Sequence, residues 1–365
     1  MLEMKCVSLS LMVALAVMGC NFGVAIGGCH RPPVIFSFGD SNADTGGLFA
    51  GLGYSLNPPN GRSFFGRPSG RLSDGRLILD FLCQSLNTRF LSPYLESLGS
   101  DFRNGANFAV VGSSTHPEYK PFALNVQVMQ FIHFRGRSLE RAAIGTRGYI
   151  NEEGFRNALY MIDIGQNDLA DSFSKNLSYA EVVRTIPVVI EEIKKAVKGL
   201  YDQGGRKFWI HNTGPLGCLP QKLWLVQHKE GDLDTSKCIS SYNSAAQLFN
   251  TALLHLCQAM KSELPDATIV HVDIYSIKYD LISNGMKYGF SSPLMACCGA
   301  GGPPYNYNIQ MTCGNYGSQA CNNGSQFISW DGIHYTEAAN AIAAKRILSM
   351  EYSSPKMPFD FFCQK

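Results

Sequence analysis

Short apolar segments alternate along the chain with longer segments of helical periodicity. The short segments have the length of strands and are apolar almost throughout, at 34–38, 107–111, 158–164, 207–211 and 268–274. Strands buried on both faces have this continuous apolar character, whereas strands with one wet face alternate. The pattern therefore predicts a sheet that is covered on both sides.

The clearest helix is predicted to follow Ser178. Ser178 and Glu181 have the spacing of a capping box, and apolar residues then recur every three or four positions as far as Leu200. Pro187 lies inside this segment, where it removes a backbone hydrogen bond and predicts a kink. A second helix is predicted to begin after Thr336. Its inward residues are Ala339, Ile342, Ala343 and Ile347.

Strands that alternate with helices predict an α/β fold whose parallel strands are joined by right-handed crossovers. The 365 residues contain no internal repeat, no low-complexity tract and no linker between two compositions. We therefore expect a single domain over residues 29–365. In such sheets the active site lies beyond the carboxyl ends of the strands.

Residues 1–28 have the pattern of a secretory signal peptide. Lys5 precedes an apolar run from Cys6 to Met18, and small residues follow, with cleavage expected between Ala25 and Gly28. The run is shorter than the roughly 20 residues of a membrane-spanning helix, and no later segment is that long and uncharged. We expect a secreted, extracellular protein with no stable membrane span.

The cysteines fit that compartment. Twelve occur in all, and the loss of Cys6 and Cys20 with the leader leaves ten, an even number that favours disulfides without revealing their connectivity. No C-x-x-C pair is present, so no structural zinc site is expected. Asn176 and Asn323 begin N-glycosylation sequons, which predicts surface positions for both.

Charge narrows the class of ligand. Lys and Arg number 31 against 29 Asp and Glu, a net charge of +2, and charged residues make up 16% of the chain. A protein that binds nucleic acid usually carries a strongly basic face. A nucleic-acid partner is therefore not expected.

A candidate nucleophile follows the first predicted strand. Ser41 lies in a turn of small and polar residues directly after 34–38, and Gly39 allows the backbone to bend sharply there. The Ser41 amide is then a candidate donor to an oxyanion. Taken alone, a serine in a strand-to-helix turn is more often a helix cap.

A candidate base lies near the other end of the chain. Asp331 and His334 are three residues apart around Gly332, so the carboxylate can accept a hydrogen bond from one ring nitrogen and leave the other as a base toward Ser41. The bland alternative is a turn cap beside a surface histidine. His211, at the end of the 207–211 strand, is the second candidate for the base.

Two further positions are candidate oxyanion donors. Gly105 lies just before the strand at 107–111 and could bring its amide close to a ligand, and Asn167 follows the strand at 158–164. Glycine and asparagine also favour turns for purely structural reasons.

Taken together, the motifs resemble the GDSL family of SGNH hydrolases, especially its secreted plant esterase/lipase branch, in order and over nearly the full length. The matching blocks are Phe38–Gly46, Asn104–Ala109, Gly165–Asp168 and Asp331–His334. Asn42 replaces the leucine that gives the family its name, as in its early-nodulin-like and fucosidase-named members.

The resemblance implies a three-layer α/β/α sandwich with a mostly parallel, flavodoxin-like sheet. It also implies ester hydrolysis by a nucleophile Ser41, a base His334 oriented by Asp331, and an oxyanion hole of Ser41, Gly105 and Asn167. No cofactor and no metal are implied. The expected substrate is a small-molecule, polysaccharide or lipid ester, most simply an acetyl or short-chain acyl ester in the cell wall or apoplast of a plant. The alternatives are a glycosidase acting on cell-wall sugars and a catalytically silent protein that binds carbohydrate or lipid.

Overall fold

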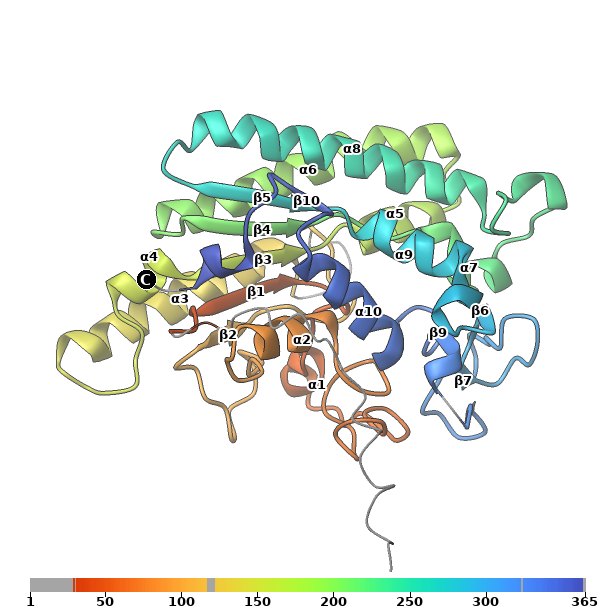
Figure 1. Ribbon diagram of the computed structural model, residues 1–365, viewed down its shortest axis with the longest axis horizontal. Coiled ribbons are helices and arrows are strands. Elements are labelled where there is room, and N and C mark those ends of the chain that lie inside the picture. Colours follow the sequence, from red (N-terminus) through yellow and green to blue (C-terminus); the bar gives the residue numbers. More distant parts are fainter. Residues whose placement is uncertain (1–28, 30, 117–121, 323, 364–365) are drawn as a thin grey trace, which may run out of the picture.

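The centre of the molecule is a six-stranded sheet in the order β10-β5-β4-β3-β1-β2 (Figure 1). The computed structural model describes residues 29, 31–116, 122–322 and 324–363. Strands β1 to β5 are parallel, and β10 pairs antiparallel with β5. The strands are β1 Ile35–Gly39, β2 Gly105–Asn107, β3 Leu159–Asp163, β4 Lys207–His211, β5 Thr268–Val272 and β10 Ser353–Ser354. The order 2-1-3-4-5 is that of flavodoxin-like sheets, so the predicted mostly parallel sheet is confirmed.

Helices cover both faces of the sheet. Phe36, Tyr160 and Phe208 face a core built with α3 (Leu124–Ala143), α6 (Tyr179–Asp202) and α8 (Ser240–Glu263). Their neighbours Ile35 and Trp209 face a second core built with α2 (Ile78–Ser85), α9 (Ile274–Ser283) and α10 (Glu337–Leu348). Alternate residues of each strand therefore enter different cores, as the near-continuous apolar runs predicted. The three-layer arrangement is confirmed.

The predicted helix caps are present. Ser178 and Glu181 exchange hydrogen bonds at the start of α6, and α6 continues through Pro187 to Asp202. The Thr336 hydroxyl accepts the Ala339 amide at 3.2 Å and begins α10. Of the inward residues predicted for α10, three are buried, and Ile342 is half-buried. A polar residue at each helix start thus satisfies amides that have no partner inside the helix.

One predicted strand is displaced. Instead of 107–111, β2 covers Gly105–Asn107. Phe108 and Val110 still donate to the carbonyls of Ser37 and Gly39 at 2.7 and 3.1 Å, but the Val111 amide turns to the Asp44 carboxylate at 2.8 Å. The chain therefore leaves the sheet toward the Ser41 turn.

The remaining elements are short and lie mainly at the carboxyl edge of the sheet. They include the helices α1 Gly47–Leu52, α4 Glu152–Asn157, α5 Gln166–Ser174 and α7 Pro220–Leu225. Two small strand pairs join β6 Ser292–Ala296 to β9 Phe327–Ser329, and β7 Cys298–Gly299 to β8 Gln319–Ala320. Among the described residues, no helix combines the length and apolar character needed to cross a membrane.

Disulfides bind eight of the ten cysteines that follow the leader. The pairs are Cys29–Cys363, Cys218–Cys238, Cys297–Cys321 and Cys298–Cys313. Cys83 and Cys257 are free and buried. The expectation of disulfides is confirmed for eight cysteines and wrong for these two, because each of the two lies in an apolar core and packs as a small hydrophobic side chain. The predicted signal peptide lies outside the described residues.

Candidate active site

Ser41 lies in the turn that leaves the carboxyl end of β1. Gly39 has φ +140°, and a Cβ there would lie 2.0 Å from the Asp163 carbonyl oxygen, so only glycine lets β1 pass β3 this closely. Gln127 of α3 clamps the same residue: it accepts the Gly39 amide and donates to the Gly39 carbonyl, both at 2.8 Å. Ser41 itself is 4% exposed. Within the described chain, neither its amide nor its hydroxyl has a hydrogen-bond partner, so both are available to a ligand.

Asp44 closes this turn onto α1. Its carboxylate accepts the amides of Gly46 at 2.7 Å, Gly47 at 2.5 Å and Val111 at 2.8 Å. Burial raises the pKa of Asp44, although these hydrogen bonds oppose the rise. Asp44 is fully engaged with the backbone, so we assign it to the structure of the turn.

Asp331 and His334 form the predicted pair. The Asp331 Oδ2 atom lies 2.6 Å from His334 Nδ1, and Oδ1 accepts the His334 amide at 2.8 Å. Burial alone would raise the pKa of Asp331, but the His334 charge and its hydrogen bonds outweigh burial and hold that pKa below its usual value. Because an ionised carboxylate only accepts, Nδ1 carries the proton. His334 Nε2 is then the basic nitrogen, and it is buried without a partner among the described residues.

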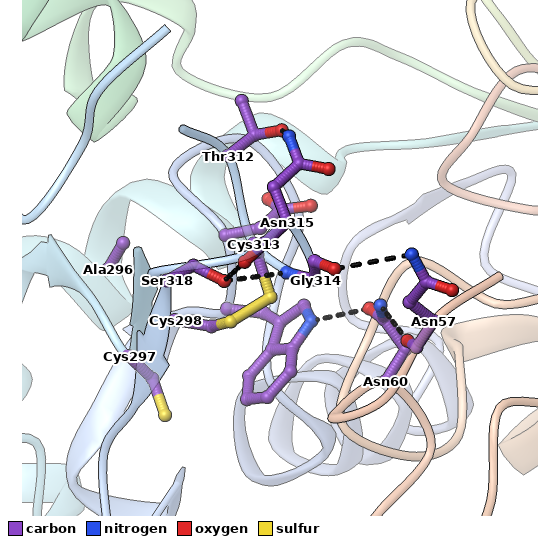
Figure 2. The surroundings of a disulfide bond; sticks show 12 residues. Asn57, Asn60, Ala296, Cys297, Cys298, Thr312, Cys313, Gly314, Asn315 and Ser318 are labelled. Atoms are coloured by element: carbon purple, nitrogen blue, oxygen red, sulfur yellow. Dashed lines mark hydrogen bonds between the residues drawn. A yellow bond between two sulfur atoms is a disulfide. The ribbon is translucent and has the colours of Figure 1, made fainter. Parts of the chain in front are cut away.

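Two disulfides lie next to the segment that carries this pair. Figure 2 shows one of them, Cys298–Cys313, with Asn60 nearby. The amides of Cys297 and Cys298 donate to the carbonyls of Ser329 and Trp330 at 3.0 and 2.6 Å, and both cysteines are disulfide-bonded. The fully buried Trp330 donates its indole N–H to Asn60 at 2.8 Å. The residues just before Asp331 are therefore held from two sides.

The Ser41 turn and the His334 segment meet at one buried cation. Lys278 of α9 is 3% exposed, and its Nζ lies 3.3 Å from Asn42 Oδ1 and 4.4 Å from the centre of the Tyr335 ring. A neighbour of Ser41 and a neighbour of His334 thus contact the same ammonium group. No hydrogen bond joins the Ser41 hydroxyl to His334 Nε2 in this structure. Such catalytic hydrogen bonds are often long without substrate and tighten when it binds.

Asn167 lies at the same edge of the sheet, directly after β3 and at the start of α5. Its Nδ2 donates to the Ser113 carbonyl at 2.9 Å, which leaves a second amide hydrogen free to donate. The residue before Ser113 is Gly112, with φ +76°. Within the described chain the Gly112 amide has no hydrogen-bond partner. Gly112 therefore fits the oxyanion position that the sequence assigned to Gly105.

The assignment of Gly105 as an oxyanion donor is wrong. Gly105 pairs with Ile35 at the amino end of β1, whereas Ser41 follows the carboxyl end. Its amide already donates to the Phe102 carbonyl at 3.1 Å, and a Cβ would lie 1.8 Å from the Ile35 oxygen. Glycine is needed here for close strand packing. The motif Asn104–Ala109 includes the whole of β2, which begins at Gly105. The end of β2 that leads toward the Ser41 turn is therefore its carboxyl end, not Gly105.

The other predicted positions are dispersed. His211 ends β4, and its Nδ1 lies 3.4 Å from Asp163 Oδ2. Asn176 is exposed in the turn between α5 and α6, and Asn323 lies outside the described residues. Across the residues that the structure describes, no group of three or more His, Cys, Asp and Glu side chains could hold a metal ion.

Two residues that lie beside these candidates, Gly112 and Lys278, were not predicted from the sequence. Gly112 directly follows the strand predicted at 107–111, so the rule that sites lie at carboxyl ends could have found it. Lys278 gave no signal, since lysines on helices are mostly exposed.

The chain is similar to known proteins over most of its length. The family model described as GDSL-like lipase/acylhydrolase matches residues 35–347. The chain is 67% identical over 347 residues to the GDSL esterase/lipase At1g09390 of Arabidopsis thaliana, covering 94% of this chain and 93% of that protein. It is 42% identical over 342 residues to alpha-L-fucosidase 3 of Arabidopsis thaliana, covering 87% and 90%.

A solved structure with a related outline is Axe2, an acetylxylan esterase from Geobacillus stearothermophilus. It shares 12% identity at a TM-score of 0.37 and covers 88% of this chain and 94% of its own. With a family model matched over most of its length, the chain belongs to the GDSL lipase/acylhydrolase family and is a carboxylic ester hydrolase.

Proposed function

We propose that the protein is a secreted serine esterase that cleaves acetyl or short-chain acyl esters through an acyl-enzyme. The carrying observation is the Asp331–His334 pair: Nδ1 is bound to a carboxylate at 2.6 Å, and Nε2 is buried without a partner. Lys278 contacts Asn42, the residue after Ser41, and Tyr335, the residue after His334, which supports a common site for the two segments.

In the proposed first step, His334 Nε2 accepts the Ser41 proton while Ser41 Oγ attacks the ester carbonyl carbon. Asp331 stabilises the imidazolium that forms. The negative carbonyl oxygen is met by the amides of Ser41 and Gly112 and by the Asn167 side chain. His334 then gives the proton to the departing alcohol, and the acyl group stays on Ser41.

The second step repeats the first with water. His334 takes a proton from water as the water oxygen attacks the acyl carbon, and Ser41 regains its proton as the acid leaves. No cofactor is needed for this balance.

A small acyl group is favoured by the enclosure of the site. Ser41 is 4% exposed and His334 is 6% exposed, so both side chains are largely withdrawn from solvent. We therefore expect acetyl esters, including acetylated polysaccharides, to be better substrates than long-chain lipids. A series of p-nitrophenyl esters of increasing chain length measures this directly, and a rate that climbs steeply above the micellar threshold of a long-chain ester would refute it.

Secretion to the cell wall or apoplast is part of the proposal. Four disulfides support an oxidising compartment, because such bonds seldom persist in the cytosol. Expression of the full chain in plant cells with recovery of the processed, glycosylated protein from the apoplast tests it. A protein that stays inside the cell with residues 1–28 still attached would contradict it.

The decisive experiment is Ser41→Ala. Loss of the nucleophile from a unit of this kind costs roughly 10⁶ in turnover. We expect the purified variant, folded as judged by circular dichroism, to lose hydrolysis of p-nitrophenyl acetate by about that factor. Hydrolysis at the parent rate would exclude Ser41 as the nucleophile.

A glycosidase is the alternative that the fucosidase name of one relative raises. Glycosidases use two carboxyl groups that flank the sugar. The acidic groups nearest Ser41 do not fit this role, because Asp40 is fully buried and Asp44 is bound to backbone amides. Release of p-nitrophenol from an aryl fucoside by Ser41→Ala at the parent rate would favour the glycosidase.

A further inference from the structure

A cluster of ionisable side chains lies beneath the Ser41 turn, and the proposed hydrolysis uses none of its members. Asp40 follows β1, Asp163 ends β3, His211 ends β4 and Lys278 lies on α9. Asp40 is 0% exposed, and Lys278 and His211 are each 3% exposed. Buried charges are costly unless they are paired. Their presence directly under a nucleophile therefore calls for a role.

Asn42 connects the cluster to the nucleophile. Its amide N–H and its Nδ2 both donate to Asp40 Oδ1 at 2.9 Å, and its Oδ1 accepts from Lys278 Nζ at 3.3 Å. Ser41 stands between Asp40 and Asn42 in the chain. The two residues that flank the nucleophile are therefore tied to each other and to one buried cation.

Lys278 reaches this position because the chain makes room for it. A Cβ on Gly214 would lie 2.9 Å from Lys278 Cδ, in space that the lysine stem occupies. The ring of Tyr335, the residue after His334, covers the ammonium group at 4.4 Å. Lysine ammonium over an aromatic face is an attractive contact, especially when it is desolvated.

We propose that Lys278 is a positioning residue for the nucleophile: through Asn42 it fixes the turn that carries Ser41, and its charge compensates the carboxylates of Asp40 and Asp163 below that turn. This role rests on the proposed function of Ser41. It also gives a physical reason for asparagine at position 42, because leucine can neither donate to Asp40 nor accept from Lys278.

The electrostatics of the cluster are consistent with this role. Burial, and next the Asp163 charge, raise the pKa of Asp40 to about 7, while the Asn42 hydrogen bonds and Lys278 oppose the rise. Burial lowers the pKa of Lys278, against the charges of Asp163 and Asp40. The charged or titratable groups that face Asp40 are Asp163 from β3 and Lys278 from α9, and His211 of β4 faces Asp163. Both Asn42 hydrogen bonds go to Asp40 Oδ1 and are stronger when Asp40 is ionised, so protonation of Asp40 near neutral pH weakens its hold on the turn.

The first test is Lys278→Met, with Lys345→Met on the exposed face of α10 as the matched control. Displacement of a reacting group by about 1 Å can cost 10²-fold in rate. We expect kcat for p-nitrophenyl acetate to fall about 10- to 100-fold with KM nearly unchanged. In a plot of kcat against pH, the fall of kcat on the acid side (the acid limb) should move to higher pH, because Asp40 loses the cation that favours its ionised form. The control should keep the parent kcat and the parent pH profile.

Two further variants keep the proposal open to refutation if Lys278→Met does not fold. Gly214→Ala places a methyl group against the lysine stem, and Asn42→Leu removes both side-chain contacts of Asn42. Each should lower kcat and shift the acid limb in the same direction as Lys278→Met. Variants that fold and keep the parent kcat and pH profile would overturn the positioning role.

A stability measurement separates this inference from the proposed function. Folded Asp40 holds its proton to a higher pH than an unfolded aspartate does, so the native state loses stability as pH rises from about 4 to about 7. Asp40→Asn should remove this decline, so that the melting temperature changes less between pH 5 and pH 8. Lys278→Met should make the melting temperature fall more steeply over the same range.

If Ser41→Ala keeps activity, the proposed function fails and the positioning role fails with it. In that case the melting curves still show whether the charge of Lys278 affects the ionisation of Asp40. If Ser41→Ala is inactive but both the melting curves and kcat ignore Lys278, only this inference fails.

Discussion

The turn that carries Ser41 and the segment that carries His334 are held by different means. The Ser41 turn leaves β1, which lies between β2 and β3 in the central sheet, and Gln127 and Asp44 grip its backbone. The His334 segment lies outside that sheet, after β9, beside two disulfides and the Trp330 indole. Regular strand pairing positions Ser41, whereas covalent bonds and single side-chain contacts position His334.

The difference shows that the interactions that stabilise a segment depend on where the segment lies relative to the central sheet. A residue at the end of a central strand inherits the rigidity of its neighbours through backbone hydrogen bonds. A loop that joins short strands has fewer such bonds to offset the conformational entropy that it loses on folding. The loops closed by Cys297–Cys321 and Cys298–Cys313 span 24 and 15 residues, and such closure removes part of that entropy.

The sharpest way to break the His334 side is Asp331→Asn. An amide of the same shape keeps the packing but favours the wrong imidazole tautomer, and the matching change in serine proteases lowers kcat about 10⁴-fold. We expect a loss of that order for p-nitrophenyl acetate hydrolysis, with the melting temperature changed far less. A loss smaller than tenfold would mean that Asp331 does not orient the base.

On the Ser41 side, Asn167→Ala removes one donor to the oxyanion while the nucleophile and base stay in place. Loss of one such donor costs about 10² to 10³ in kcat, which p-nitrophenyl acetate hydrolysis measures.

Gly105→Ala is the contrasting variant, because a Cβ at 1.8 Å from the Ile35 oxygen must disturb the pairing of β1 with β2. We expect Gly105→Ala to lower the unfolding midpoint in urea. A soluble, fully stable Gly105→Ala enzyme with a specific loss of kcat would restore Gly105 to the oxyanion hole.

The smallest expected effect comes from opening one covalent bond near the base, with Cys298→Ala and Cys313→Ala combined. A 15-residue loop predicts about 3 kcal/mol of lost stability in the chain-entropy account. Urea unfolding measures that loss, and kcat should fall as well because the Cys298 amide holds the Trp330 carbonyl.

The control opens the Cys29–Cys363 disulfide by combining Cys29→Ala with Cys363→Ala. That bond ties the two ends of the described chain together at the far end of the sheet from β6 and β9 (Figure 1). It should lower stability and leave kcat unchanged. Equal losses of kcat in both double variants would mean that the disulfides next to Trp330 have no special bearing on the base.

The sequence predicted much of this fold because its signals are local. The strand at 207–211 and the caps at Ser178 and Thr336 occur where the apolar pattern and the capping residues placed them. The Asp331–His334 hydrogen bond was also predictable, since three residues around a glycine bring the two side chains within reach. The strand at 107–111 was displaced because a distant carboxylate, Asp44, draws the Val111 amide out of the sheet.

What the amino-acid order determined by itself was the α/β class, the buried strands and the chemical types gathered at their carboxyl ends. Tertiary structure alone decided that Gly105 serves strand packing, that Asn167 binds the carbonyl next to Gly112, which cysteines pair, and that Lys278 is buried between Asn42 and Tyr335. The physical reason is range: periodicity and capping act over a few residues, whereas a buried charge or a close approach between strands depends on partners that folding brings from far along the chain.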